Sequence, residues 1–294
     1  MLRRLLSAWL FVFVASGATA QDRPQVVAVN YPLQYFAERL LGDDADVVFP
    51  VPADVDPSFW RPTVADITTI QSADLILLNG AGFATWVDRV SLPRAKTVNT
   101  TAAIEDQFIF TESITHSHGE GEEHSHEGLA SYLWLDPTLA AAQAQAVADA
   151  ITARGLSPAD DVAARMAELQ ADLEALDTQA SSALADLQDV TIITTHPRYQ
   201  YLARRYGLTV NSLEWEAGAA PTDDELDALT SLITETGARV LIWEATPPEA
   251  AFAQTAALGV ENVVFVSLAH QSDDSKFIDA FSDGLAALTT LTSQ

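Results

Sequence analysis

The chain of 294 residues contains no cysteine. This absence excludes a disulfide framework, a lipid-modified N-terminal cysteine and every metal site that uses thiolate ligands. A transition-metal site in this protein would therefore be built from histidine and carboxylate side chains.

Basic residues are scarce as well: 15 Lys and Arg stand against 41 Asp and Glu, for a formal net charge of −26. Such a charge argues against nucleic acid or an anionic membrane surface as a partner, because both repel an acidic protein. This negative net charge suits a cationic ligand, because opposite charges attract. The alternative is a general acidic bias that serves solubility alone.

Long apolar runs are also missing, apart from one at the N-terminus. Residues 1–20 have a basic start at Arg3 and Arg4, an apolar stretch from Leu5 to Val14 and a small-residue cleavage site at Ala18-Thr19-Ala20, which is typical of a secretory signal. The apolar stretch is much shorter than the roughly 20 residues of a membrane span. We expect a cleavable signal peptide and a soluble protein of the Gram-negative periplasm that starts near Gln21.

Histidine, by contrast, is concentrated in one place. Four of the six histidines, His116, His118, His124 and His126, lie in an acidic and glycine-rich stretch within residues 113–127. Neutral imidazole is a common ligand of zinc and its neighbours in the transition series, so this loop is predicted to collect divalent metal. The alternative is a solvated low-complexity loop with no role.

The size of the mature chain and the order of its apolar segments predict two α/β lobes with parallel sheets. The N-terminal lobe is predicted over residues 21–155, including the loop, and the C-terminal lobe over residues 189–294. Expected strands are residues 26–29, 47–51, 75–78, 190–193, 208–213, 240–243 and 263–268, and expected helices are residues 32–41, 66–72, 83–90, 137–153, 198–206, 250–257 and 276–291. A capping box at Thr222–Glu225 predicts the start of a further helix.

Residues 156–188 are predicted to form a helix that links the lobes. Ser157 is expected to cap the N-terminus of this helix, with Pro158 in its first turn. Apolar residues recur every three or four positions from Val162 to Leu187 and form one stripe along the helix. With no Gly or Pro between Ala159 and Gln188, a single helix of about 30 residues and roughly 45 Å is expected. Such a helix would join the lobes rigidly.

Polar side chains follow three predicted strands of the C-terminal lobe: His196, Glu216 and Glu244. Ligands of open parallel sheets bind at the carboxyl ends of strands, and a histidine with two carboxylates suits zinc or manganese. The alternatives are a packing or helix-capping role for His196 and simple ion pairs of the glutamates with Arg198, Arg204 or Arg205. His270, after the last strand, is either a solvated loop residue or a ligand.

Three stretches resemble the zinc- and manganese-type solute-binding proteins of bacterial ABC importers: Gln71–Gly80, Trp134–Pro137 and Thr195–Gly207. The resemblance covers nearly the whole mature chain. It implies two α/β lobes joined by a long rigid helix, a metal site in the cleft between them, and delivery of the metal to a membrane permease.

The ligand positions depart from that family's pattern. Ser58 and Tyr132 stand where the resemblance implies histidines, His196 matches, and Ser267–His270 stands where an acidic ligand is implied. One hypothesis is a rebuilt site, in which loop histidines join His196 and Glu244 or Glu216. The other is a periplasmic zinc buffer or metallochaperone that binds metal mainly through the loop. We favour the first, because His196, Glu216 and Glu244 all stand at strand ends.

An enzyme is not expected, because the sequence has no His-Glu-x-x-His motif, no Gly-x-Ser-x-Gly elbow and no phosphate-binding glycine loop. The sequence predicts a monomeric receptor for a divalent transition metal. Zinc is the expected ion, and manganese, nickel and copper are the alternatives. Because ligating histidines must be deprotonated, affinity is expected to fall below about pH 6.

Overall fold

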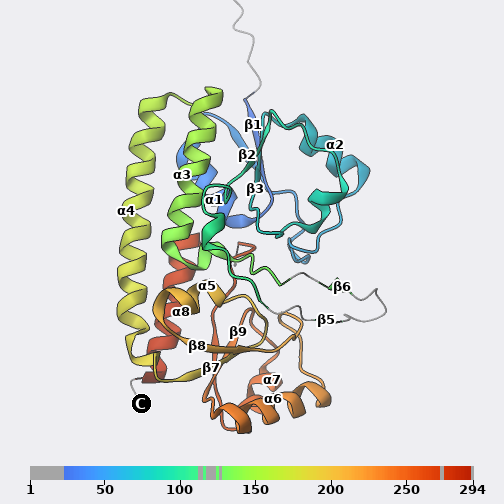
Figure 1. The fold of residues 1–294 in the computed structure, drawn as a ribbon, viewed down its shortest axis with the longest axis vertical. Coiled ribbons are helices and arrows are strands. Elements are labelled where there is room, and N and C mark those ends of the chain that lie inside the picture. The colour runs from blue at the N-terminus through green and yellow to red at the C-terminus, as the bar shows by residue number, and fades with distance from the viewer. Residues whose placement is uncertain (1–22, 112–114, 117–123, 126–127, 272–274, 293–294) are drawn as a thin grey trace, which may run out of the picture.

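The computed structural model describes residues 23–111, 115–116, 124–125, 128–271 and 275–292. The predicted signal peptide, His118 and His126 lie outside the described residues. Two four-stranded parallel sheets, in the orders β2-β1-β3-β4 and β10-β9-β7-β8, form two lobes (Figure 1). The predicted α/β class with two parallel sheets is confirmed.

In the four-stranded sheet of the N-terminal lobe, every strand pairs in parallel with its neighbours, and the crossover between β1 and β2 carries the first helix. The regular elements are β1 (Gln25–Ala28), α1 (Tyr31–Leu41), β2 (Asp46–Val48), α2 (Val64–Ser72), β3 (Leu75–Leu78) and β4 (Thr97–Asn99). Strand β4 was not predicted from the sequence. The predicted helix at residues 83–90 is instead a short 3-10 helix, η1 (Thr85–Arg89).

The predicted histidine loop contains two short strands, β5 (Thr115–His116) and β6 (His124–Ser125), which pair antiparallel with His116 opposite His124. They lie on the side of the molecule away from α4 (Figure 1). At the base of the loop, Phe110 bridges to Leu129 and Ala130 N–H donates to the Ile109 carbonyl at 3.0 Å. The loop therefore begins and ends on one paired stem.

Two long helices follow, α3 (Pro137–Arg154) and α4 (Ala159–Ala183), after the 3-10 helix η3 (Leu133–Leu135). Helix α4 is shorter than predicted, about 37 Å at the usual rise, because it gives way to the 3-10 helix η4 (Ala185–Leu187). Ser157 does not cap it: its hydroxyl donates to Asp44 at 2.6 Å. Helix α4 runs beside both lobes and packs against α1 and α8 (Figure 1).

The C-terminal lobe repeats the alternation of strand and helix. Its elements are β7 (Thr191–Thr194), α5 (Gln200–Tyr206), β8 (Thr209–Ser212), α6 (Asp223–Thr236), β9 (Val240–Trp243), α7 (Glu249–Ala256), β10 (Glu261–Val264) and α8 (Phe277–Thr292). The capping box of Thr222 and Glu225 is present at α6. Strand β10 both begins and ends earlier than the predicted strand at residues 263–268, and Leu268 in the following loop has a positive φ of 61°.

One apolar core continues from lobe to lobe. Phe277 and Phe281 of α8 are fully buried, and the Phe277 ring stacks on Tyr35 of α1 with centroids 5.5 Å apart. Thus the last helix of the C-terminal lobe packs on the first helix of the N-terminal lobe. Buried aromatic contacts of this kind hold the lobes together through α1, α4 and α8.

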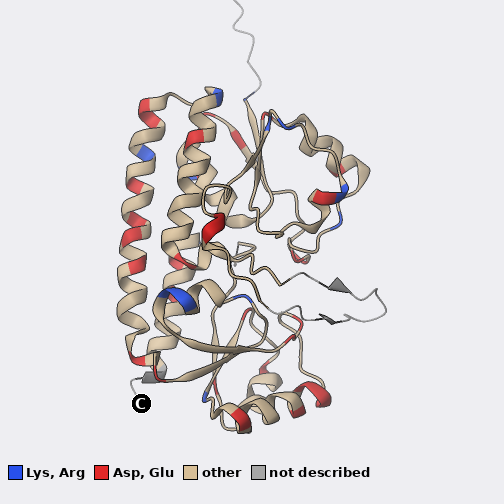
Figure 2. Ribbon diagram, viewed as in Figure 1, with Lys and Arg blue, Asp and Glu red and all other residues tan. Residues whose placement is uncertain are grey.

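Within the described residues, none of the helices is long and apolar enough to cross a membrane. Acidic side chains are spread over both lobes and recur along α4 and α6 (Figure 2).

Candidate metal centre

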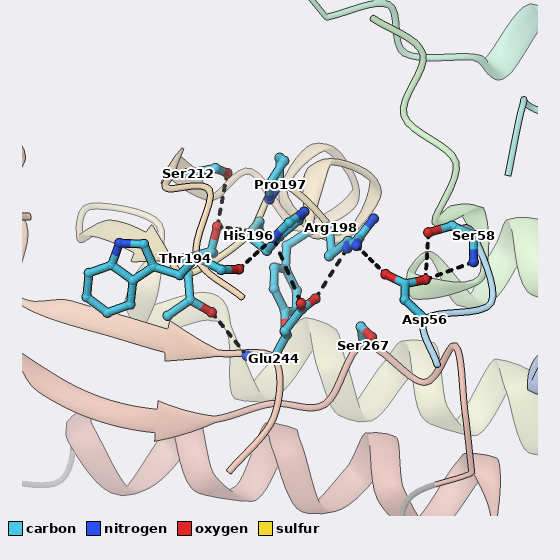
Figure 3. Close-up of polar contacts among 12 residues, drawn as sticks. Asp56, Ser58, Thr194, His196, Pro197, Arg198, Ser212, Glu244 and Ser267 are labelled. Atoms are coloured by element: carbon cyan, nitrogen blue, oxygen red, sulfur yellow. Dashed lines mark hydrogen bonds and ion pairs between the residues drawn. The ribbon is translucent and has the colours of Figure 1, made fainter. Parts of the chain in front are cut away.

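The carboxyl ends of the central strands in both sheets point toward the region between the lobes. His196 and Arg198 follow β7 and Glu244 follows β9, while Asp56 and Ser58 face them from the N-terminal lobe (Figure 3). Glu214, which follows β8, and Tyr132 of the N-terminal lobe line the same cavity as His196 and Arg198. Ligand sites of open parallel sheets occur at such strand ends. Both lobes therefore supply side chains to a single site.

His196 is buried and held in one orientation. Its Nδ1 lies 2.8 Å from the Trp215 carbonyl oxygen, which accepts the Nδ1–H, and this hydrogen bond puts the ring lone pair on Nε2. Nε2 lies 3.9 Å from Oε2 of Glu214. The His196 carbonyl accepts from the Thr194 hydroxyl at 3.0 Å and from Arg198 N–H at 2.9 Å. The segment thus presents an oriented imidazole, which is what a metal ligand needs.

Arg198 is a buried cation that joins the two lobes. Its Nε donates to Glu244 at 3.3 Å, and its NH2 donates to Asp56 at 2.7 Å across the lobe boundary (Figure 3). The guanidinium lies 4.5 Å from the centroid of the Tyr132 ring. Asp56 in turn accepts from the Ser58 hydroxyl at 2.6 Å and from Ser58 N–H at 2.8 Å. A fixed positive charge therefore occupies the space between two carboxylates.

The buried pair of Glu244 and Arg198 has shifted pKa values. Burial raises the pKa of Glu244, and Arg198 opposes that shift. Burial lowers the pKa of Arg198, but Tyr132, Glu244 and Asp56 outweigh it, and the net shift is upward. Arg198 is therefore permanently charged.

The two glutamates predicted as ligands are placed differently. Glu244 lies 4.0 Å from Nδ1 of His196, but its carboxylate is paired with Arg198, so the ion pair considered as an alternative is present. Glu216 is exposed and does not line the cavity. Glu214, which the sequence reasoning missed, does line it. The alternation of side chains at the end of β8 was the available signal: Ser212 and Glu214 line the cavity, and Leu213 between them is buried on the other face.

A cavity of about 340 Å³ lies beside His196. Residues of both lobes line it, among them Ser58, Tyr132, His196, Arg198, Gln200 and Glu214. Among the residues that the structure describes, no group of three or more His, Asp or Glu side chains is arranged to hold a metal ion. The described part of the cavity thus offers two donors of metal-ligand type at close range, His196 and Glu214.

Of the other histidines, His270 is the one whose side chain lies within the described part of the chain. The backbone of His116 and His124 is described in β5 and β6, without their side chains, and His118 and His126 lie outside the described residues. His270 is not among the residues that line the cavity. Its Nε2 lies 2.6 Å from the Val55 carbonyl oxygen and its ring packs on Phe49, which makes it a contact between the lobes.

Two α/β lobes on a shared layer of helices, with a cavity between them that both lobes line, define the class of two-lobed solute-binding proteins. The sequence profile of the family described as zinc-uptake complex component A, periplasmic, matches residues 26–291. The chain belongs to this family.

Individual relatives agree with that assignment. The zinc-binding lipoprotein AdcA of Streptococcus pneumoniae serotype 4 is 25% identical over 234 residues, covering 78% of this chain and 46% of AdcA. The high-affinity zinc uptake system protein ZnuA of Bacillus subtilis is 27% identical over 206 residues, covering 66% of this chain and 61% of ZnuA. This chain therefore spans about half the length of AdcA and under two thirds of ZnuA.

Among solved structures, the Zn(II)-bound ZnuA-like domain of Streptococcus pneumoniae AdcA superposes with a TM-score of 0.76 at 21% identity, covering 93% of this chain and all of that domain. At this identity the similarity establishes the fold, and the chemistry of the site has to be argued from this chain's own residues.

Proposed function

We propose that this protein is a zinc receptor that binds the ion in the cavity between the lobes and passes it to the membrane permease of an ABC importer. The observation that carries the proposal is His196: its Nδ1–H is held by the Trp215 carbonyl, and the ring lines the cavity beside Glu214. A fixed imidazole next to a carboxylate is a common pair of zinc ligands.

The cargo is zinc because nitrogen and carboxylate donors suit it, and because the named relatives AdcA and ZnuA are zinc proteins by description. Manganese is the alternative that a carboxylate-containing site also accepts. The protein acts as a binding component and not as an enzyme. Residues 1–20 direct its export, and the mature chain works in the periplasm as a monomer.

The histidine loop collects the ion first. Thr111 N–H donates to the Gly128 carbonyl, and Thr111, Gly128, Leu129 and Ala130 all line the cavity. The stem of the loop is thus part of the cavity wall, so the segment that carries His116, His118, His124 and His126 starts and ends beside the cavity. The acidic surface favours the approach of a cation. Glu244 contributes indirectly, because it holds Arg198 in place. Glu216 does not line the cavity, so its role as a metal ligand stays a prediction.

A periplasmic zinc buffer or metallochaperone is the second candidate. The observation that favours it is the lack, within the described ranges, of three metal-binding side chains in one group. In that case the loop would hold the metal by itself, and the cavity would contribute nothing to affinity.

Zinc titration separates the two candidates. Full-length mature protein, a deletion of residues 113–127, His196→Ala and the control His270→Ala are compared by calorimetry. The deletion is structurally matched, since Thr111 and Gly128 are already hydrogen-bonded neighbours. We expect the deletion to lower the number of zinc ions bound but to keep one site, which His196→Ala removes and His270→Ala leaves. If the deletion abolishes tight binding and His196→Ala changes nothing, the receptor proposal is wrong.

A further inference from the structure

The stem of the histidine loop, residues 109–111 and 128–130, contacts both lobes. By sequence the stem belongs to the N-terminal lobe, yet its apolar side chains share one cluster with the fully buried ring of Tyr201, which lies on α5 of the C-terminal lobe. Helix α5 begins four residues after His196. One short helix therefore connects the stem of the loop to the segment that carries the proposed zinc ligand.

The Tyr201 hydroxyl forms part of the pairing of this stem. Ala130 N–H donates directly to the Ile109 carbonyl at 3.0 Å. In an antiparallel ladder such a pair also exchanges the reciprocal bond, from Ile109 N–H to the Ala130 carbonyl. Here the hydroxyl takes the place of that bond, since it accepts from Ile109 N–H at 3.2 Å and donates to the Ala130 carbonyl at 3.0 Å. A side chain of one lobe thus completes the backbone pairing of the other.

Tyr201 is itself held in this position. Burial raises its pKa above the usual value, so the hydroxyl keeps the proton that it donates. On the next turn of α5, the Arg204 guanidinium lies 5.1 Å from the centroid of the Tyr201 ring and donates to the Gln107 carbonyl at 2.6 Å. Helix α5 therefore binds the stem and also the segment that leads into it.

The stem lies at the cavity as well as on α5. Thr111, Gly128, Leu129 and Ala130 line the cavity that His196 also lines. Transfer between two linked binding groups depends on their effective concentration, which the length and stiffness of the link determine. A stem fixed on α5 is a short and stiff link, because it keeps both ends of the loop beside His196.

We infer that Tyr201 is a positioning residue for zinc uptake: its hydroxyl fixes the histidine loop to α5 and so sets how fast zinc passes from the loop to His196. This inference rests on the proposed function and names the residue that couples its two parts. In Tyr201→Phe the ring stays in its apolar cluster, whereas Ile109 N–H and the Ala130 carbonyl pair directly. The stem then keeps its own pairing and loses its hydrogen bonds to α5.

Stopped-flow transfer of zinc from a weak fluorescent chelator to the full mature chain tests the inference. The kinetic phase that His196→Ala abolishes reports the loading of the cavity. We expect Tyr201→Phe to slow this phase at least about threefold in the full chain and to leave it unchanged in the 113–127 deletion. The equilibrium affinity of the cavity for zinc should stay the same in both backgrounds.

Tyr206→Phe is the matched control. It removes a tyrosine hydroxyl from the same helix, but that hydroxyl donates to Asp177 of α4, so the phase should keep its rate. Arg204→Gln is a second variant, which loses the bond to the Gln107 carbonyl. It should slow the phase less than Tyr201→Phe does, and again only when the loop is present.

Two results overturn the inference. One is a wild-type rate for Tyr201→Phe in the full chain. The other is equal slowing with and without residues 113–127, which would mean that the hydroxyl acts on the cavity wall and not through the loop. The receptor proposal fails on a different result, a deletion variant that shows no phase dependent on His196.

Discussion

The two lobes contribute different chemistry to one cavity. The C-terminal lobe supplies the imidazole of His196, the carboxylate of Glu214 and the guanidinium of Arg198, whereas the N-terminal lobe supplies hydroxyl groups and aromatic rings. Asp56 is the acidic group of the N-terminal lobe that meets Arg198, and it is bound by that cation. Among the described side chains of the cavity, those of metal-ligand type therefore belong to the C-terminal lobe, while Asp56 of the N-terminal lobe holds Arg198 in place.

The largest expected effect comes from removing the Arg198 side chain, which pairs with Asp56 across the lobe boundary. Arg198→Met leaves Asp56 and the buried Glu244 without their cation, and we expect the free energy of unfolding to fall by about 3–5 kcal/mol. Arg39→Met breaks the half-exposed ion pair of Arg39 with Asp172. This variant should lower the free energy of unfolding by less than about 1 kcal/mol. Urea denaturation measures both. Equal losses in the two variants would mean that Arg198 does not couple the lobes.

The loss in Arg198→Met should depend on pH with a defined sign. Burial already raises the pKa of Glu244. A carboxyl whose pKa is raised on folding contributes stability at low pH, and that contribution is lost as the pH rises through the folded-state value. Without Arg198 the pKa of Glu244 rises further, so the variant should be closest to wild type in acid and furthest from it in alkali. Adding Glu244→Gln should remove most of this pH dependence.

A second prediction removes the difference between the lobes by adding a nitrogen donor to the N-terminal side. Ser58 is buried and lines the cavity, so Ser58→His places an imidazole opposite His196. We expect zinc affinity to rise about tenfold, or roughly 1.4 kcal/mol, since a third protein ligand is added. Ser58→Asn controls for side-chain size. An unchanged affinity in the histidine variant, measured by competition with a zinc chelator, would place the metal away from Ser58.

A smaller effect is expected where α4 meets the C-terminal lobe. Asp177 accepts from Arg205 at 2.6 Å and from the Tyr206 hydroxyl at 2.9 Å, and Arg205 holds the pKa of this carboxyl below its usual value. A lowered pKa contributes stability above the unfolded-state value, near pH 4, that is lost as the pH falls through the folded value. Asp177→Asn should lower the free energy of unfolding by about 1 kcal/mol at pH 7. The unfolding midpoints of both proteins are measured over a series of pH values. The difference between Asp177→Asn and wild type should vanish near pH 2, and a difference that stays constant with pH would contradict the role given to Asp177.

The smallest prediction concerns a feature that the lobes share. Thr63 opens α2 and Thr222 opens α6, each with a complete capping box. Thr63→Ala and Thr222→Ala should each cost about 0.5–1 kcal/mol. Thr230→Ala, in the middle of α6, is the control and should cost less. Losses at the two caps that differ several-fold would show that one lobe unfolds before the other, which thermal unfolding with separate probes would detect.

Most of the secondary structure could be read from the sequence because it follows local rules. The continuous apolar runs at Leu75–Leu78 and Val240–Trp243 became central strands of the two sheets, with the predicted bounds. The short strand β4 has no such run, and it is extended because β3 pairs with it. Likewise, no local signal distinguishes the 3-10 helix η1 from an α-helix of similar length. Elements that depend on a neighbour were the ones missed.

The class of the protein follows from its amino-acid sequence alone. Strand ends in parallel α/β sheets are marked by the switch from apolar to polar residues, and this pattern located His196 and Glu244, while the lack of cysteine limited the ligands to nitrogen and oxygen donors. Only the tertiary structure decided what those residues do. Arg198 reaches Asp56, which lies 142 residues away, and takes up the carboxylate of Glu244. Side-chain partners over such separations depend on how the lobes pack, and no local pattern encodes them.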